Sequence, residues 1–161
     1  MTRAAVGLGA NLGDPAATLR EAIAALAALP DSRLLAASRL YRTPAWGRTE
    51  QPDFVNAVAL LETALPPRAL LQRLLEIERA FGRVRVEGER WGPRVLDLDL
   101  LLHGDAVVDE PGLRVPHPHL HERAFALLPL LEAWPEAVIP GIGPARGCAA
   151  AMDAGGIAAL P

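Results

Sequence analysis

The stretch Arg83–Asp99, R-V-R-V-E-G-E-R-W-G-P-R-V-L-D-L-D, combines four arginines, a Gly-Pro turn and two aspartates. From Val95 the chain becomes an apolar run of strand length, so we expect a β-strand here. Side chains alternate between the two faces of a strand, which places Asp97 and Asp99 on one face, about 6.6 Å apart. Their leucine neighbours then point into a core on the other face.

Two carboxylates at this spacing repel each other, and a hard divalent cation such as Mg²⁺ is the natural compensation. Magnesium held by one or two carboxylates usually also takes phosphate oxygens from a substrate. The arginines just upstream can neutralise the remaining phosphate charge by bidentate contacts. A solvent-facing pair of aspartates is the ordinary interpretation of an isolated D-x-D, but the density of arginines here favours a polyphosphate with metal.

The composition of the chain limits the other possibilities. With 161 residues, 51% hydrophobic and 22% charged, we expect a single globular domain over residues 1–161. A net charge of −3 argues against a protein that binds nucleic acid or a membrane surface. The single cysteine, Cys148, fits a reducing compartment, and neither a membrane-length apolar run nor a signal-peptide pattern is present. We therefore expect a cytoplasmic monomer.

The N-terminal part predicts a strand followed by a helix. Residues 4–9 form a short apolar strand, and the glycines in G-L-G-A-N-L-G at 7–13 are interpreted as a tight strand-to-helix turn. Their spacing is one residue too long for the dinucleotide-binding fingerprint. Asp14 is the expected N-cap, Pro15 the first helical residue and Pro30 the stop.

Two further strands are predicted over residues 33–41 and 54–63, joined by a long polar loop at 42–53. Long loops in compact domains are often functional. Phe54 and Asn56 share one face of the later strand, where an aromatic ring beside a carboxamide suits a flat heterocycle. A core phenylalanine with a turn-facing asparagine is the plainer alternative.

A second helix opens at Pro66-Pro67 and precedes the arginine-rich stretch. Its expected buried stripe consists of Leu70, Leu74, Ile77 and Phe81. Glu78 flanks this stripe, and it either orients Arg83 or Arg85 or is a surface residue.

The stretch R-V-P-H-P-H-L-H-E-R-A-F at 114–125 contains three closely spaced histidines. A zinc site is disfavoured because the prolines break regular geometry and D-x-D prefers a harder ion. A histidine that donates a hydrogen bond to phosphate beside Arg123 is the better interpretation, with Phe125 as a second aromatic around a ring. A short buried helix over 127–134, a turn at 141–144 and a last helix in the alanine-rich tail complete the prediction.

The segment W-G-P-R-V-L-D-L-D at 91–99 resembles the signature of the 6-hydroxymethyl-7,8-dihydropterin pyrophosphokinases of folate biosynthesis. Four blocks match this family in order: G-A-N-L-G; Y-R-T-P with Q-P-D-F-x-N; R-V-R through D-L-D; and V-P-H-P with R-A-F. Periodicity predicts the order β-α-β-β-α-β. The resemblance implies an α+β fold with a ferredoxin-like β-α-β-β-α-β core, a mainly antiparallel central sheet and helices on its faces.

The resemblance also implies an activity. Enzymes of this family transfer pyrophosphate from ATP to the hydroxymethyl group of 6-hydroxymethyl-7,8-dihydropterin with Mg²⁺, giving AMP and the dihydropterin diphosphate. ATP and the dihydropterin are then the small-molecule partners.

Site residues are carried over from the family pattern by position. The ligands of two Mg²⁺ ions would be Asp97 and Asp99. The catalytic arginines would be Arg83 and Arg94. The ATP contacts would come from Arg85, His117 and Arg123. The pterin would be bound by Thr43, Pro44, Trp46, Phe54, Asn56 and Phe125. Four matching positions carry no role argued from chemistry: Gln51, Asp53, Glu78 and Trp91.

The chain departs from the family pattern in two places. The segment 86–89 is acidic where a second basic residue often follows R-x-R, and Gly112 and Arg114 stand where polar nucleotide contacts are common. Two alternatives come from other classes of protein: a non-catalytic pterin- or nucleotide-binding module, and an RNA binder that stacks bases on Phe54 and Phe125. The net negative charge argues against the RNA binder.

Overall fold

The computed structural model describes residues 1–43, 52–82 and 95–161. Its centre is a sheet in which β1 (Thr2–Ala10) lies between β4 (Phe54–Thr63) and β5 (Asp97–His103). On the far side of β4 lie two short strands, β2 (Ser32–Ala37) and β3 (Tyr41–Thr43), and the C-terminal β10 (Ala158–Ala159) pairs with β3. All of these pairings are antiparallel.

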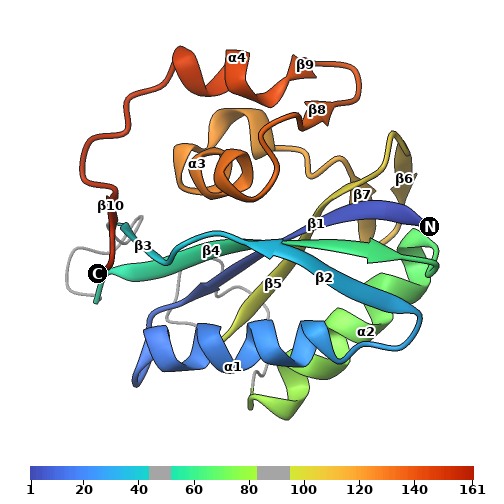
Figure 1. Ribbon diagram of the computed structural model, residues 1–161, viewed down its shortest axis with the longest axis horizontal. Coiled ribbons are helices and arrows are strands. Elements are labelled where there is room, and N and C mark those ends of the chain that lie inside the picture. The colour runs from blue at the N-terminus through green and yellow to red at the C-terminus, as the bar shows by residue number, and fades with distance from the viewer. Residues whose placement is uncertain (44–51, 83–94) are drawn as a thin grey trace.

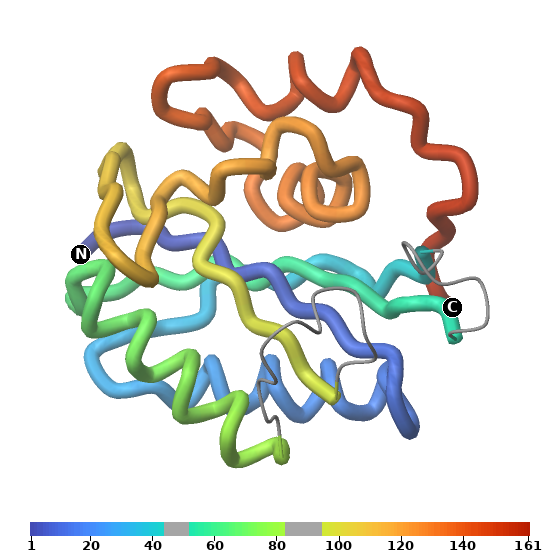
Figure 2. The backbone as a smooth tube through the Cα atoms, turned by 180° about the vertical axis from the view of Figure 1, so that it is seen from behind, coloured from blue at the N-terminus to red at the C-terminus, as the bar shows by residue number. Residues whose placement is uncertain are grey.

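Helices cover both faces of the sheet (Figures 1 and 2). α1 (Pro15–Ala27) connects β1 to β2, and α2 (Pro67–Ala80) connects β4 to β5; both lie on one face. α3 (Ala124–Ala133) lies over the other face, and α4 (Ala145–Ala150) packs against α3 on the side away from the sheet. The predicted α+β architecture with β-α-β-β-α-β order is confirmed. Within the described ranges, no helix combines the length and apolarity needed to cross a membrane.

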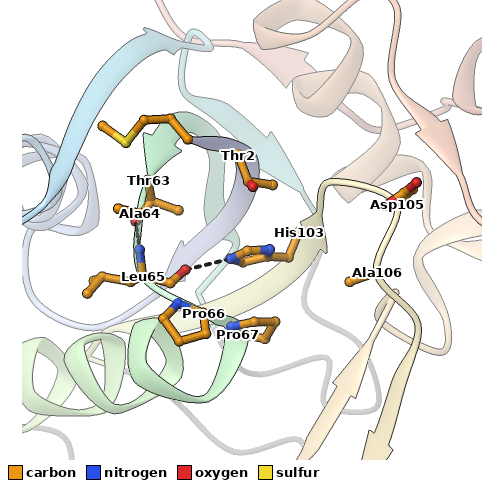
Figure 3. A pocket seen from close by; sticks show the side chains of 10 residues that line it. Thr2, Thr63, Ala64, Leu65, Pro66, Pro67, His103, Asp105 and Ala106 are labelled. Carbon is orange, nitrogen blue, oxygen red and sulfur yellow. Dashed lines mark hydrogen bonds between the residues drawn. The ribbon is translucent and has the colours of Figure 1, made fainter.

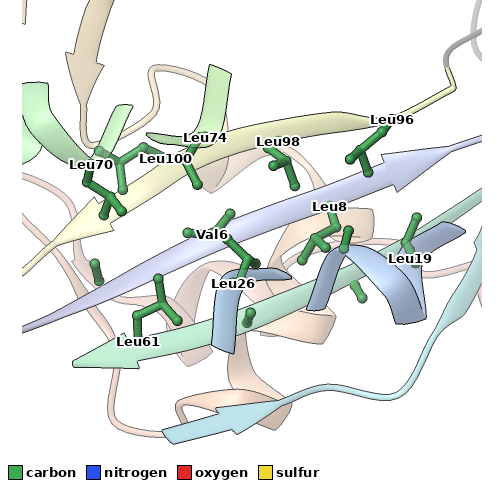
Figure 4. Close-up of a cluster of buried hydrophobic side chains, with 14 of the residues drawn as sticks. Val6, Leu8, Leu19, Leu26, Leu61, Leu70, Leu74, Leu96, Leu98 and Leu100 are labelled. Atoms are coloured by element: carbon green, nitrogen blue, oxygen red, sulfur yellow. The ribbon is translucent and has the colours of Figure 1, made fainter. Parts of the chain in front are cut away.

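Each face of the sheet has its own hydrophobic core, because strand side chains alternate. Under α1 and α2, leucines of the helices pack against β1, β4 and β5 (Figure 4). Fully buried members of this core include Val6, Leu19, Leu26, Leu61, Leu70, Leu74 and Leu96. A smaller core under α3 contains Leu101, Leu127 and Leu130. This smaller core includes Leu101 and Leu102 of β5, whereas neither Asp97 nor Asp99 belongs to it among the described residues.

The strand predicted over residues 33–41 is interrupted at Ser38. The Ser38 backbone N–H donates to the Val58 carbonyl, and the Val58 N–H donates to the Ser38 hydroxyl, both at 2.9 Å. A side-chain oxygen thus replaces a backbone carbonyl in the ladder, and the chain leaves the sheet until Tyr41.

Several short elements were not predicted from the sequence. They are β6 (Val108–Glu110), β7 (Leu113–Val115), the 3-10 helix η1 (Leu120–Glu122), β8 (Val138–Ile139) and β9 (Gly143–Pro144). The tail forms the expected helix, α4, and then runs past the sheet edge to β10.

Leu74→Ala tests the core under α2. Leu74 is fully buried, so the substitution should lower the free energy of unfolding by about 2–5 kcal/mol, measured by urea denaturation. Leu12→Ala is the control, because Leu12 is 37% exposed and its truncation should cost less than about 0.5 kcal/mol. Equal losses in the two variants would contradict the assigned core.

Candidate active site

The two aspartates of β5 lie on the α3 face of the sheet, as predicted. Leu98 and Leu100 belong to the core under α1 and α2, so Asp97 and Asp99 point to the opposite face, where both are half-buried. The leucines of β5 therefore pack in the hydrophobic core, and its two carboxylates face the candidate site.

Glu78 of α2 holds the backbone between these aspartates. Its carboxylate accepts the Leu98 N–H at 2.7 Å, and its side chain is only 2% exposed. Since β5 is an edge strand, this N–H would otherwise lack a partner within the sheet. The surface interpretation of Glu78 is wrong. The suggested contacts with Arg83 and Arg85 concern residues outside the described ranges.

The glycines before α1 require a correction. The strand predicted over residues 4–9 is confirmed, and Gly7 and Gly9 lie inside it and not in the turn; Gly13, with φ of 63°, is the glycine that the turn requires. Gly9 pairs with Asn56 on one side and with Asp97 on the other. Paired residues of antiparallel strands share a face, so β1 has no side chain between the amide and the carboxylate.

Asn56 has an unpaired oxygen on this face. Its side chain is buried, at 8% exposed, and among the described residues Oδ1 has no hydrogen-bond partner. A Cβ built on Gly9 would lie 3.7 Å from Asn56 Nδ2, so the amide leans over the bare strand. An unpaired buried acceptor is costly unless a ligand satisfies it, which makes this oxygen a candidate binding group.

The neighbouring strand, β3, adds further residues to the face that carries Asn56. Thr43 pairs with Phe54, and Tyr41 pairs with Asn56, so all four residues share the α3 face. Thr43 is buried and Phe54 half-buried. The predicted face shared by Phe54 and Asn56 is confirmed. Asp53 is exposed immediately before β4.

His117 is tied to the same strand as the aspartates. Its backbone N–H donates to the Leu101 carbonyl at 2.9 Å, and Leu101 is two residues beyond Asp99. The His119 N–H donates to Nδ1 of the His117 ring at 3.3 Å, so the neutral ring carries its proton on Nε2. Burial lowers the pKa of His117 to about 4, aided by the nearby charges of Arg123 and Arg114. At neutral pH His117 is therefore an uncharged donor.

Arg123 and Phe125 stand together where α3 begins. Arg123 is the N-cap residue, and its guanidinium carbon lies 5.7 Å from the centre of the Phe125 ring. This distance is within the range of a cation–π contact. The pair brings a cation and an aromatic ring to the face that carries Asn56 and the aspartates.

Seven predicted site residues lie outside the described ranges: Pro44, Trp46, Gln51, Arg83, Arg85, Trp91 and Arg94. They belong to two segments, 44–51 and 83–94, whose flanking residues are described. Thr43, which precedes the first segment, is the last residue of β3, and Val95, which follows the second, lies two residues before Asp97 at the start of β5.

The described residues contain no metal-ligand cluster of three side chains, and the cavity around His103 lies away from the candidate site. Across the described parts of the chain, no three histidine, cysteine, aspartate or glutamate side chains gather, and the three histidines at 117–121 form no such group. A shallow cavity of about 580 Å³ lies around His103, at the other end of β5 (Figure 3). Six residues, or roughly 20 Å of strand, separate His103 from Asp97.

Two parts of this face were not predicted from the sequence. Gly7 and Gly9 repeat with the same spacing as Asp97 and Asp99, which is the pattern that could have revealed a shared face. Glu132 of α3 accepts hydrogen bonds from Arg39 and Tyr41. These partners are distant in the sequence, so no local sequence pattern predicts the contact.

Comparisons with known proteins agree with the geometry. A sequence model of the 7,8-dihydro-6-hydroxymethylpterin-pyrophosphokinase (HPPK) family matches residues 5–135. A 2-amino-4-hydroxy-6-hydroxymethyldihydropteridine pyrophosphokinase of Methylorubrum extorquens is 48% identical over 98% of both chains. The enzyme of the same name from Pseudomonas aeruginosa is 47% identical, over 86% of this chain and 84% of its own.

A solved structure has the same fold. The Plasmodium falciparum HPPK-DHPS with pteroate superimposes with a TM-score of 0.70 over 92% of this chain, at 14% identity. The present chain spans 42% of the length of that protein. At this identity the likeness concerns the fold alone.

The depressed pKa of His117 predicts a pH dependence of stability. Between pH 6.5 and about 4 the unfolded chain binds a proton that the folded chain excludes, so the free energy of unfolding should fall as the pH falls through this window. His117→Gln should remove this part of the slope, and His121→Gln should keep it. Urea denaturation at pH 4.5, 5.5 and 7 measures the slopes. A His117→Gln slope equal to that of the wild type would refute the assignment.

Proposed function

The chain belongs to the 7,8-dihydro-6-hydroxymethylpterin-pyrophosphokinase family, and we propose that the α3 face of its sheet is the site where the two substrates meet. As a member of this family it is a diphosphotransferase of folate biosynthesis that transfers pyrophosphate to hydroxymethyldihydropterin, with ATP as co-substrate. The positions of the substrates, the metal ions and the residue roles are our proposal.

The pterin lies over the bare strand with its polar edge at Asn56. The free Oδ1 accepts from an N–H of the pterin edge, and the Asn56 amide can donate to a neighbouring ring nitrogen or oxygen. Phe54 and Phe125 supply aromatic faces, and Thr43, Pro44 and Trp46 complete this end of the site. The observation that carries the proposal is this unpaired buried oxygen, on the same face as two carboxylates.

The phosphates lie at β5, the last of the three neighbouring strands that carry Asn56, Gly9 and Asp97. Asn56 and Asp97 are two strands apart, about 10 Å, with only Gly9 between them. A flat two-ring heterocycle bound at Asn56 can span this gap and extend its hydroxymethyl group toward the aspartates. The hydroxyl oxygen then bonds to the β-phosphorus, the bond to the α-phosphate oxygen breaks and AMP leaves.

Asp97 and Asp99 fit a magnesium site by their chemistry. They are hard oxygen donors, they share one face, and the Glu78 contact fixes the backbone between them. We propose that they hold two Mg²⁺ ions, which when bound neutralise phosphate charge. Arg83, Arg85 and Arg94 supply further positive charge from the adjoining segment.

His117 and Arg123 bind the nucleotide phosphates. The Nε2–H of a neutral His117 can donate to a phosphate oxygen without adding charge, while Arg123 adds a permanent cation. The protein acts mainly by holding the substrates in line and by neutralising developing charge. We propose that one domain of residues 1–161 does this as a cytoplasmic monomer that does not bind nucleic acid.

Asp97→Asn and Asp99→Asn test the metal end. Each should lower turnover about 1,000-fold, because removal of a metal ligand loses several kcal/mol of transition-state stabilisation. Each should remain folded, since neither carboxylate belongs to a core. AMP formation from ATP and the dihydropterin is the assay, and Asp105→Asn, an exposed residue past the other end of β5, is the control. Turnover near that of the control at saturating Mg²⁺ would rule out the assignment.

Gly9→Ala tests the bare strand. The added methyl group meets Asn56 only at an ordinary 3.7 Å contact, and alanine is less costly than glycine within a strand, so stability should be kept or slightly raised. The methyl group would nevertheless occupy the space beside the Asn56 amide. We expect the pterin dissociation constant, measured by calorimetry, to rise about tenfold or more, the cost of losing one well-placed polar contact. Unchanged affinity would show that the pterin does not cross Gly9.

A further inference from the structure

A network of side-chain hydrogen bonds joins Arg39, Tyr41 and Glu132 beside the proposed site. Both carboxylate oxygens of Glu132 on α3 accept from Arg39 Nε, at 3.2 and 3.1 Å, and Oε2 also accepts from Arg39 Nη2 at 3.0 Å. The Arg39 backbone N–H donates to Oε1 at 2.5 Å, and the Tyr41 hydroxyl donates to Oε2. We call these three residues the Glu132 cluster.

The break in the edge strand makes this cluster possible. Ser38 takes over the pairing with Val58, which leaves the next residue, Arg39, out of the ladder. The Arg39 N–H, which has left the ladder, donates to the Glu132 carboxylate of α3. The Arg39 guanidinium carbon also lies 5.7 Å from the centre of the Tyr41 ring. The interruption is thus the point at which α3 is tied to the sheet.

Both ends of this tie belong to elements that line the proposed pterin site. On the sheet, Tyr41 pairs directly with Asn56, and Thr43 follows two residues later on the same face. On the helix, Phe125 and Glu132 are seven residues apart, which is within about 20° of two full turns, so they share a flank of α3. The cluster therefore connects the helix flank that carries Phe125 to the strands that carry Asn56.

The charges of the cluster persist at all physiological pH values. Burial alone would raise the pKa of Glu132, but the hydrogen bonds from Arg39 and Tyr41 lower it to about 2. The carboxylate thus stays an acceptor for its donors. An ordinary surface ion pair with a single contact contributes little, whereas convergent, charge-assisted hydrogen bonds fix a geometry.

We propose that Tyr41, Arg39 and Glu132 are positioning residues for the pterin: they set the distance between Phe125 on α3 and the Asn56 strand, and so the width of the slot that takes the ring. This inference rests on the proposed placement of the pterin at Asn56. None of the three residues touches the reacting atoms, so their effect should appear in pterin affinity before it appears in phosphate transfer.

The first experiment compares two like substitutions. Glu132→Gln and Tyr41→Phe each remove hydrogen bonds of the cluster and leave its shape. Glu62→Gln is the matched control, because Glu62 pairs with an edge-strand arginine, Arg33, at 2.9 Å on the same sheet. It lies six residues, or roughly 20 Å, along β4 from Asn56. All variants are first checked for cooperative thermal unfolding above the assay temperature.

Calorimetry then measures two affinities. The dihydropterin is titrated into protein saturated with Mg²⁺ and a non-hydrolysable ATP analogue, and the analogue is titrated separately. Glu132→Gln and Tyr41→Phe should raise the pterin dissociation constant about fivefold, the effect of one hydrogen bond, and change that of the analogue less than about twofold. Glu62→Gln should change neither by more than about twofold. If Glu132→Gln does not fold, Tyr41→Phe carries the same test.

A double variant identifies the route of the effect. If the cluster acts through Phe125, Glu132→Gln should have little further effect on pterin affinity when Phe125 is already alanine, because interacting residues are not additive. Full additivity, equal weakening of both ligands, or a pterin effect no larger than that of Glu62→Gln would each overturn the proposal.

Asn56→Ala separates this proposal from its premise. If Asn56→Ala weakens pterin binding while the cluster variants do not, the positioning role fails and the proposed function stands. If Asn56→Ala and Phe125→Ala both leave pterin binding unchanged, the placement of the pterin fails, and the positioning role fails with it.

Discussion

The site depends on an absence of side chains along the middle of the sheet. On the α3 face, Gly9 of β1 lies between Asn56 of β4 and Asp97 of β5, and Gly7 lies between Val58 and Asp99. Gly9 does not have a positive φ, so the backbone conformation does not require glycine there. What glycine provides at this position is the absence of a side chain beside Asn56. A Cβ at Gly9 would lie beside the Asn56 amide, whereas a Cβ at Gly7 would meet the Leu101 side chain at 3.3 Å, because Leu101 already packs over that part of the strand.

The opposite face of the same strands supplies the stability that such an open face cannot. Val6 and Leu8 of β1 and Leu98 of β5 point into the core beneath α1 and α2. Because side chains alternate along a strand, one face of the sheet stabilises the fold and the other carries the candidate site. The carboxylate pair on β5 adds repulsion to an edge strand. Among the described strands β5 pairs only with β1, and the contact from Glu78 to the Leu98 N–H fixes the backbone between the two aspartates from the other side.

Strand alternation explains why much of this arrangement was predictable from the sequence. The shared faces of Asp97 with Asp99 and of Phe54 with Asn56 follow from period 2 alone, and both are confirmed. The same rule puts Gly7 and Gly9 on one face of their strand, but their pairing with the aspartates depends on which strands become neighbours, and glycines before a helix also fit a turn. Glu132 and Ser38 act through partners 93 and 20 residues away, so local pattern could not reveal them. The burial of Glu78 likewise depends on where α2 packs.

We propose that the two substrates meet across the bare strand, with the pterin at Asn56 and the phosphates at the aspartates. A crystal structure with Mg²⁺, a non-hydrolysable ATP analogue and the dihydropterin tests this most directly. We expect the Asn56 oxygen to accept from the edge of the pterin, the hydroxymethyl group to point past Gly9, and metal ions on Asp97 and Asp99. A pterin bound away from Asn56, or metal ions held without either aspartate, would contradict the account.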